Sequence, residues 1–162
     1  MKSKRNLVVG LLLAGAAVIA LGSVAVASGG HKGKDNDRHA KKIVVVERAT
    51  TDTPIDNAPV GEDSIGDTLA FGNQLFDKTN TMMVGTDQGS CVRTVVGVAY
   101  ECTWSNSLKG GQIMVEGPFL DAGDSVLAIT GGTGKYRDVT GTMDLHALPG
   151  GTSYLFTFHI HH

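Results

Sequence analysis

Residues 97–137 contain three short segments in which the side chains alternate in character, separated by glycine turns. The first, 98–104, alternates apolar and polar residues with a period of two, which is typical of a strand with two different faces. Two more such segments, 112–116 and 125–130, follow at short intervals and end at glycines. Strands at this regular spacing predict an all-β sandwich or barrel.

The same pattern continues on both sides of this run and predicts eight strands with no helix. Closing eight antiparallel strands into an up-and-down barrel removes the sheet edges and leaves room for one small ligand. A two-sheet sandwich is the alternative. The five additional strands are expected at 42–49, 66–77, 81–95 with a bend or bulge at 85–89, 138–147 and 152–161.

The N-terminal part of the chain has the composition of an export signal. Basic residues in 1–5 precede an apolar run over 7–27 that ends in Ala25-Val26-Ala27. This pattern predicts a signal peptide, 1–27, cleaved after Ala27, and hence secretion. An uncleaved membrane anchor is the alternative. Residues 28–42 hold no large apolar side chain and are expected to form a flexible linker before a single domain, 43–162.

The charge balance bears on the partners of the domain. The full chain carries 14 Lys and Arg against 16 Asp and Glu, a net charge of −2. Removal of the signal leaves 11 basic and 16 acidic residues, a net charge of −5. This balance, without a basic stripe, argues against a nucleic acid or an anionic membrane as partner.

No cofactor or metal is expected from the motifs. The glycine run at 131–137 lacks the spacing of a phosphate loop and is followed by no helix. His159 and His161 alternate on one strand face, but no cysteine or carboxylate stands at ligand spacing from them.

Cys91 and Cys102 are expected to form a cross-strand disulfide. A two-residue hairpin turn at Val96-Gly97 pairs residue 95 with 98 and, in the same register, 91 with 102. Cysteines opposed in this way lie within disulfide range, and export exposes them to an oxidising compartment.

Glu47 is the first candidate for chemistry. It ends the apolar run Ile43 to Val46 and shares a strand face with Ile43 and Val45. A buried carboxyl group without a cation has a raised pKa, and such groups gather at functional sites. A structural ion pair at the rim of the barrel is the alternative.

The segments YECTWSN, VEGPF and AITGGTGKY resemble those of the allene oxide cyclase family and are similar to the related dirigent proteins. The resemblance extends from Glu47 to Phe158. It implies an eight-stranded barrel, usually a homotrimer, with a small hydrophobic ligand in the lumen. Glu47 falls on the family glutamate that assists opening of a strained epoxide.

The resemblance also implies a set of lumenal residues. It places Phe71, Asn73, Cys91, Tyr100 and Phe119 around the ligand; a packing role is the alternative. Trp104 shares the strand face of Tyr100. The sequence departs from the family pattern in two ways. Ala49 replaces the asparagine of the water site, where Thr53-Pro54 stands for serine-proline, and Cys102 faces Cys91.

Two functions remain in competition. In the first, the domain is an isomerase, a cyclase that confines an unsaturated substrate in one conformer, with Glu47 as the polar trigger. In the second, it is a non-catalytic dirigent-like guide or a carrier of lipophilic ligands. Because the water site is altered, production of jasmonate precursors is not expected.

Overall fold

The computed structural model describes residues 41–57 and 61–162, so the expected signal peptide and most of the expected linker lie outside the described residues. Within the described part, no helix is long and apolar enough to cross a membrane. One short 3-10 helix, η1 (Gly134–Tyr136), accompanies the strands. The strands are β1 (Lys41–Arg48), β2 (Thr53–Ile55), β3 (Thr68–Phe71), β4 (Gln74–Asp77), β5 (Met83–Val95), β6 (Ala99–Leu108), β7 (Gly111–Leu120), β8 (Ser125–Gly132), β9 (Thr140–Ala147) and β10 (Ser153–His161).

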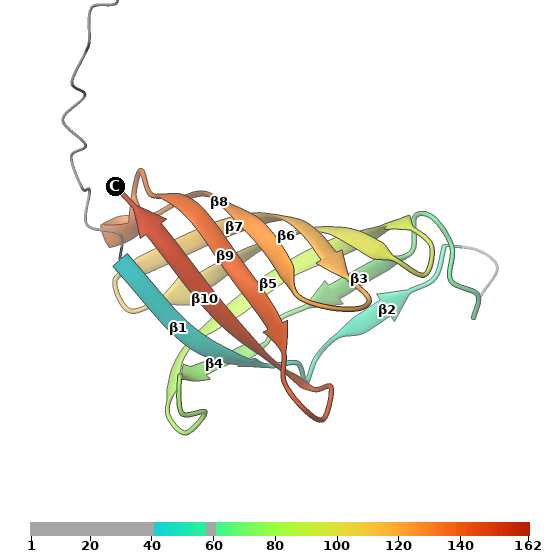
Figure 1. Cartoon of the computed structure of the whole chain (residues 1–162), viewed down its shortest axis with the longest axis horizontal. Helices are drawn as coiled ribbons and strands as arrows, with labels where there is room; N and C mark the ends of the chain where they lie inside the picture. Colours follow the sequence, from blue (N-terminus) through green and yellow to red (C-terminus); the bar gives the residue numbers. More distant parts are fainter. Residues whose placement is uncertain (1–40, 58–60) are drawn as a thin grey trace, which may run out of the picture. The chain divides into compact units, whose positions relative to one another are not determined.

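The strands close into an antiparallel barrel, as predicted. They follow the order β2-β3-β5-β4-β1-β10-β9-β8-β7-β6, and a further pairing of β5 with β6 joins the ends. β4 pairs with β1, and β3 pairs with β2. β1 and β2 therefore act as one interrupted strand of the barrel, and β3 and β4 act as another. Each continuous or interrupted strand of the barrel is called a stave below. The described strands therefore make eight staves that curl around one lumen (Figure 1).

The lumen is filled by the alternate residues of each strand, because successive side chains point to opposite faces of a sheet. On β10, Phe156, Phe158 and Ile160 are almost wholly inaccessible, whereas His161 is exposed. β9 and β7 contribute Met143 and Ile113 in the same way. The two ends of the lumen differ, because apolar side chains fill one end and the other holds a cavity and several polar groups.

The predicted second strand, 66–77, is wrong as a continuous element. It is interrupted at Gly72 and Asn73, where Asn73 exchanges two backbone hydrogen bonds with Asp87 of β5. The short strand β2, which lies between the strands predicted at 42–49 and 66–77, was not predicted. Both differences lie at one corner of the barrel, where β4 pairs with β1 before the break and β3 pairs with β2 beyond it.

The irregularity predicted at 85–89 is found at the start of that range and only on one edge of β5, where the register with β4 shifts between Met83 and Gly85. On the other edge, β5 keeps an unbroken register with β6 from Gly85 to Arg93, and a further shift follows between Arg93 and Val95. At the turn, Val95 pairs with Ala99 rather than with Val98. The shift beyond Arg93 compensates for this difference and leaves Cys91 opposite Cys102, as predicted.

The outer face of β1 is partly covered by the chain itself. Val46 is 2% exposed and lies opposite Phe76 of β4. The guanidinium of Arg48 stacks 3.6 Å from the centre of the Phe76 ring and donates hydrogen bonds to Asn80. The burial of Val46 therefore requires no second subunit.

Candidate functional site

A cavity of about 80 Å³ occupies one end of the lumen. Asp52, which is exposed, lies where the cavity meets solvent. The lining is mainly apolar and aromatic, as in many small-molecule sites, and it includes no lysine, arginine or histidine. The lining residues are Glu47, Asp52, Leu69, Phe71, Cys91, Cys102, Trp104, Phe119, Leu145, Tyr154 and Phe156.

Aromatic rings from four strands meet around this cavity. Trp104 of β6 makes an edge contact with Phe71 and a tilted contact with Phe156, with ring centres 5.8 and 5.9 Å apart. Phe119 packs edge-on against Tyr154 at 5.8 Å. Such contacts give the site a shape that is fixed before a ligand enters. Of the residues expected in the lumen, the structure places Phe71, Cys91, Trp104 and Phe119 on the cavity wall.

Glu47 brings a carboxyl group to the apolar wall. It is 5% exposed, and its Oε1 accepts a hydrogen bond of 2.9 Å from Nδ2 of Asn73. Burial, followed by the negative charge of Asp87, raises the pKa of Glu47 to about 9, although the Asn73 hydrogen bond opposes the shift. Glu47 is therefore a neutral carboxylic acid at neutral pH, and no cation of residues 41–57 and 61–162 pairs with it at the rim.

Asn73 holds this end of the barrel together without lining the cavity. Its Nδ2 donates to Glu47 and, at 2.7 Å, to Oδ1 of Asp52. Its Oδ1 accepts from the backbone N–H groups of Thr50 and Thr51, both at 3.0 Å. The side chain is thus fully engaged with the corner after β1, and its role is to orient the carboxyl groups.

Asp87 is a polar residue of the site that the sequence analysis missed. It lies on β5, is 2% exposed, and accepts a hydrogen bond of 3.1 Å from the backbone N–H of Asn73. Burial raises its pKa to about 6. The alternation of β5 contained a signal for it, because residues 87, 89, 91 and 93 share one face. The bulge expected at 85–89 obscured that signal.

Tyr154 is a second weak acid on the cavity wall. It lies opposite Ala147 on β9 and opposite Glu47 on β1. Partial burial, with the nearby carboxyl groups of Asp52 and Glu47, raises the pKa of its phenol. Its hydroxyl is therefore a donor rather than an anion across the physiological range.

Cys91 and Cys102 form the expected disulfide, with their Cα atoms 4.0 Å apart. Both are nearly inaccessible and lie on the cavity wall. A disulfide cannot act as a thiol nucleophile or acid. The sulfur atoms at this site contribute apolar surface only.

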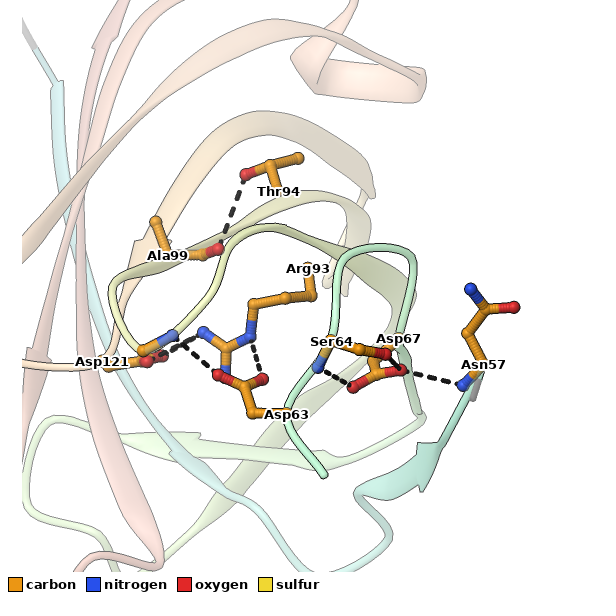
Figure 2. Close-up of polar contacts among 9 residues, drawn as sticks. Asn57, Asp63, Ser64, Asp67, Arg93, Thr94, Ala99 and Asp121 are labelled. Atoms are coloured by element: carbon orange, nitrogen blue, oxygen red, sulfur yellow. Dashed lines mark hydrogen bonds and ion pairs between the residues drawn. The ribbon is translucent and has the colours of Figure 1, made fainter. Parts of the chain in front are cut away.

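Tyr100 and Pro54 lie away from the cavity. They line a separate surface depression together with Arg93, whose guanidinium stacks 3.6 Å from the centre of the Tyr100 ring. Arg93 also pairs with Asp63 at 2.6 Å and with Asp121 at 2.7 Å. Figure 2 shows Arg93 between these two carboxylates, which come from different loops.

A neighbouring carboxylate, Asp67, closes the loop before β3. It accepts hydrogen bonds from the backbone N–H groups of Asn57 and Ser64 and from the Ser64 hydroxyl (Figure 2). These hydrogen bonds lower its pKa. Arg93 and Asp67 therefore serve the structure of the loops around the open end of the barrel.

In residues 41–57 and 61–162, no three side chains of histidine, cysteine, aspartate or glutamate are placed to hold a metal ion. His159 instead pairs with Asp144 at 2.9 Å. His146 forms a similar exposed pair with Asp124.

The geometry defines a class of protein: a closed eight-stranded antiparallel barrel with an aromatic cavity at one end and a buried carboxylic acid in its wall. The model of one family, allene oxide cyclase, matches residues 32–162. The chain therefore belongs to the allene oxide cyclase family.

Solved structures share this barrel at low sequence identity. Pyocyanin demethylase is 22% identical with a TM-score of 0.66, covering 74% of this chain and 99% of its own. The pterocarpan synthase dirigent protein PsPTS1 is 15% identical with a TM-score of 0.63, covering 75% and 94%. The exo-specific intermolecular Diels-Alderase AbnU is 16% identical with a TM-score of 0.53, covering 75% and 99%. At these identities the likeness concerns the fold.

Proposed function

We propose that this barrel binds a small unsaturated hydrophobic molecule and controls the stereochemistry of its ring closure or coupling, with Glu47 as a neutral acid. The observation that supports this most directly is the position of Glu47, a buried carboxyl group with a raised pKa on a mainly apolar and aromatic cavity wall. Family membership and the likeness to dirigent and Diels-Alderase barrels support the same class of chemistry.

Confinement supplies the first part of the proposed mechanism. The rings of Phe71, Trp104 and Phe119 hold a flexible chain in one folded conformer, which removes the entropy cost of bringing its reacting ends together. A cavity of about 80 Å³ takes the narrow end of such a ligand. The rest of the ligand then occupies the open end beside Asp52.

Glu47 supplies the second part. A neutral carboxylic acid donates a hydrogen bond to a carbonyl or epoxide oxygen of the ligand and polarises it. Any positive charge that develops along the carbon chain meets the faces of aromatic rings, which attract cations. Because burial keeps Glu47 protonated, this donor is present at neutral pH.

The second candidate is a dirigent-like guide or carrier without catalysis. Two observations favour it. The disulfide removes the only cysteine thiols of the chain, and Ala49 offers no side-chain amide to hold a water molecule. In this case the cavity selects one conformer of the ligand and does not change the rate of its reaction.

One experiment separates the two candidates. The purified full chain is incubated with a linear conjugated trienone that closes slowly to a racemic ring, and both the rate and the enantiomeric excess are measured. A cyclase raises both quantities, and Glu47→Gln lowers the rate by about 10²-fold or more. A guide raises only the enantiomeric excess and is insensitive to Glu47→Gln. An unchanged rate and a racemic product would contradict the proposed function.

Export and assembly belong to the same proposal. We propose secretion with cleavage after Ala27, a homotrimer, and no membrane or nucleic-acid partner for the mature domain. N-terminal sequencing of the protein recovered from the culture medium tests the cleavage, and retention of the intact chain in membranes would contradict it. Native mass spectrometry gives the number of subunits and the mass of any ligand that co-purifies.

A further inference from the structure

Asp87 has a buried oxygen that no hydrogen-bond donor reaches. Its Oδ1 is satisfied by the backbone N–H of Asn73, but its Oδ2 is buried and has no partner among the described residues. A buried acceptor without a donor costs free energy, more so if it is charged. The fold therefore gains if a neighbouring group can donate to this oxygen.

Glu47 is the neighbour placed to do so. Glu47 lies opposite Leu75, Leu75 lies opposite Gly85, and Asp87 is the next residue along β5 on the same face as Gly85. Asn73 contacts both acids, through Nδ2 to Glu47 and through its backbone N–H to Asp87. The two acids also affect each other directly, because the charge of Asp87 raises the pKa of Glu47 and the nearby Glu47 carboxyl group lowers that of Asp87.

We propose that Asp87 is a positioning residue whose Oδ2 accepts a hydrogen bond from a protonated Glu47, so that the two buried carboxyl groups share one proton. The pair then carries a single negative charge. Asp87 keeps the proton on Glu47, and a ligand oxygen in the cavity competes with Asp87 for it.

Among the described residues around the pair, no cation is placed to replace this proton. Asp52 and Tyr154 are the other titratable groups that face Glu47 in the described residues. The charge of Asp52 disfavours a second negative charge, whereas the Tyr154 phenol is neutral and supplies no cation. Arg48, the next residue along β1, turns outward onto Phe76 and Asn80. Two adjacent carboxylates without a cation do not both ionise, so one proton remains on the pair.

This inference rests on the proposed function for the role of the shared proton, which is to select ligands that carry an acceptor oxygen. It predicts that 2-cyclohexenone, which has a carbonyl group, binds more tightly than cyclohexene, which has the same ring without it. Trp104 is the single tryptophan of the chain and lines the cavity, so its fluorescence reports binding of both probes.

The test is a ¹³C NMR titration of the full chain labelled at the side-chain carboxyl carbons, in the wild type, Asp87→Asn and the control Asp144→Asn. Asp144 is an exposed acid paired with His159, remote from the cavity. The wild type and the control should show Glu47 titrating above pH 7. Asp87→Asn should lower that midpoint by about one unit or more, because a like charge is removed and the introduced amide donates to the Glu47 carboxylate.

The binding measurement gives a readout that a purely structural role would not move. In Asp87→Asn, the affinity for 2-cyclohexenone should fall at pH 8, about twofold for a shift of one pH unit and about tenfold for a shift of two, and recover at pH 6, while cyclohexene binding stays unchanged at both. Should Asp87→Asn fail to fold, Glu47→Gln provides the second test, because it should remove one of two carboxyl titrations between pH 5 and 10. A Glu47 midpoint that is unmoved in Asp87→Asn, or two carboxyl titrations that persist in Glu47→Gln, would overturn the inference. These titrations need no substrate, so they are independent of whether ring closure occurs.

Discussion

Gly89 of β5 lies directly opposite Trp104 of β6. A β-carbon added at Gly89 would overlap the Cβ and the backbone of Trp104 and the carbonyl of Thr103. The missing side chain is therefore what allows the indole to lie across the strand and reach the cavity wall.

Gly89→Ala should displace Trp104. Overpacking of a filled core costs about 1–3 kcal/mol, and the displaced ring should narrow the cavity and change the tryptophan emission. Urea unfolding and fluorescence check both effects. Gly72→Ala is the matched control, since a β-carbon there makes only ordinary contacts. Equal stability of the two variants would refute the role assigned to Gly89.

Glu47 should make the folded state less stable as the pH rises. Its pKa is about 9 in the folded state against 4.5 for a free side chain, so between these values only the folded state holds the proton. The stabilising contribution is complete below about pH 4.5 and is lost towards pH 9, with a slope of about 1.4 kcal/mol per pH unit. Asp87 adds a slope of the same sign up to about pH 6.

The measurement is the free energy of unfolding in urea between pH 5 and pH 9. Starting at pH 5 avoids the acid range, where the lowered pKa of Asp77, about 2, acts in the opposite direction. Glu47→Gln should flatten the curve above pH 6, whereas Glu116→Gln, at an exposed position, should not. Parallel curves for the wild type and Glu47→Gln would show that Glu47 ionises normally.

The disulfide should contribute to stability rather than to chemistry. Cys91 and Cys102 close a loop with a sequence separation of 11, and replacing both by alanine should cost about 2–3 kcal/mol by the chain-entropy estimate. Thermal unfolding measures this loss. Binding of 2-cyclohexenone, measured well below the melting temperature, should change less than threefold. A loss of binding without a loss of stability would instead assign the sulfur atoms to the site.

Arg93 should hold the loops at the open end of the barrel. Replacing Arg93 with glutamine removes the ion pairs with Asp63 and Asp121 and the stacking on Tyr100 (Figure 2). Because both carboxylates are partly exposed, the expected cost is about 1.5–3 kcal/mol. Limited proteolysis should cut faster in the loop that carries Asp63. Arg137→Gln, at an exposed position, is the control, and identical cleavage rates in both variants would contradict this role.

The hairpin that joins β5 to β6 shows what local pattern can predict. The opposition of Cys91 and Cys102 follows from alternation on either side of one short turn, and it holds although the turn itself differs from the prediction. Glu47 was identified in the same way. Its neighbours on the strand are apolar, and such a strand leaves few solvent-facing positions for an acid.

Asp87 and Tyr100 show where that reasoning fails. The face on which Asp87 lies depends on every residue of β5, so one wrongly placed bulge reverses it. Tyr100 alternates correctly with Cys102 and Trp104, yet it lies near the start of β6, under Arg93 and outside the cavity. How deeply Tyr100 is buried depends on which loops cover this end of β6.

The period-two alternation and the glycine turns determined by themselves that this chain forms antiparallel strands in sufficient number to close, because strand periodicity is a property of neighbouring residues. Only the tertiary structure decided that Glu47, Asn73 and Asp87 meet. They come from three staves, and Asn73 reaches both acids only because the stave of β3 and β4 breaks beside it. The protonation of Glu47 follows from that meeting, since burial and the charge of a residue 40 positions away set its pKa.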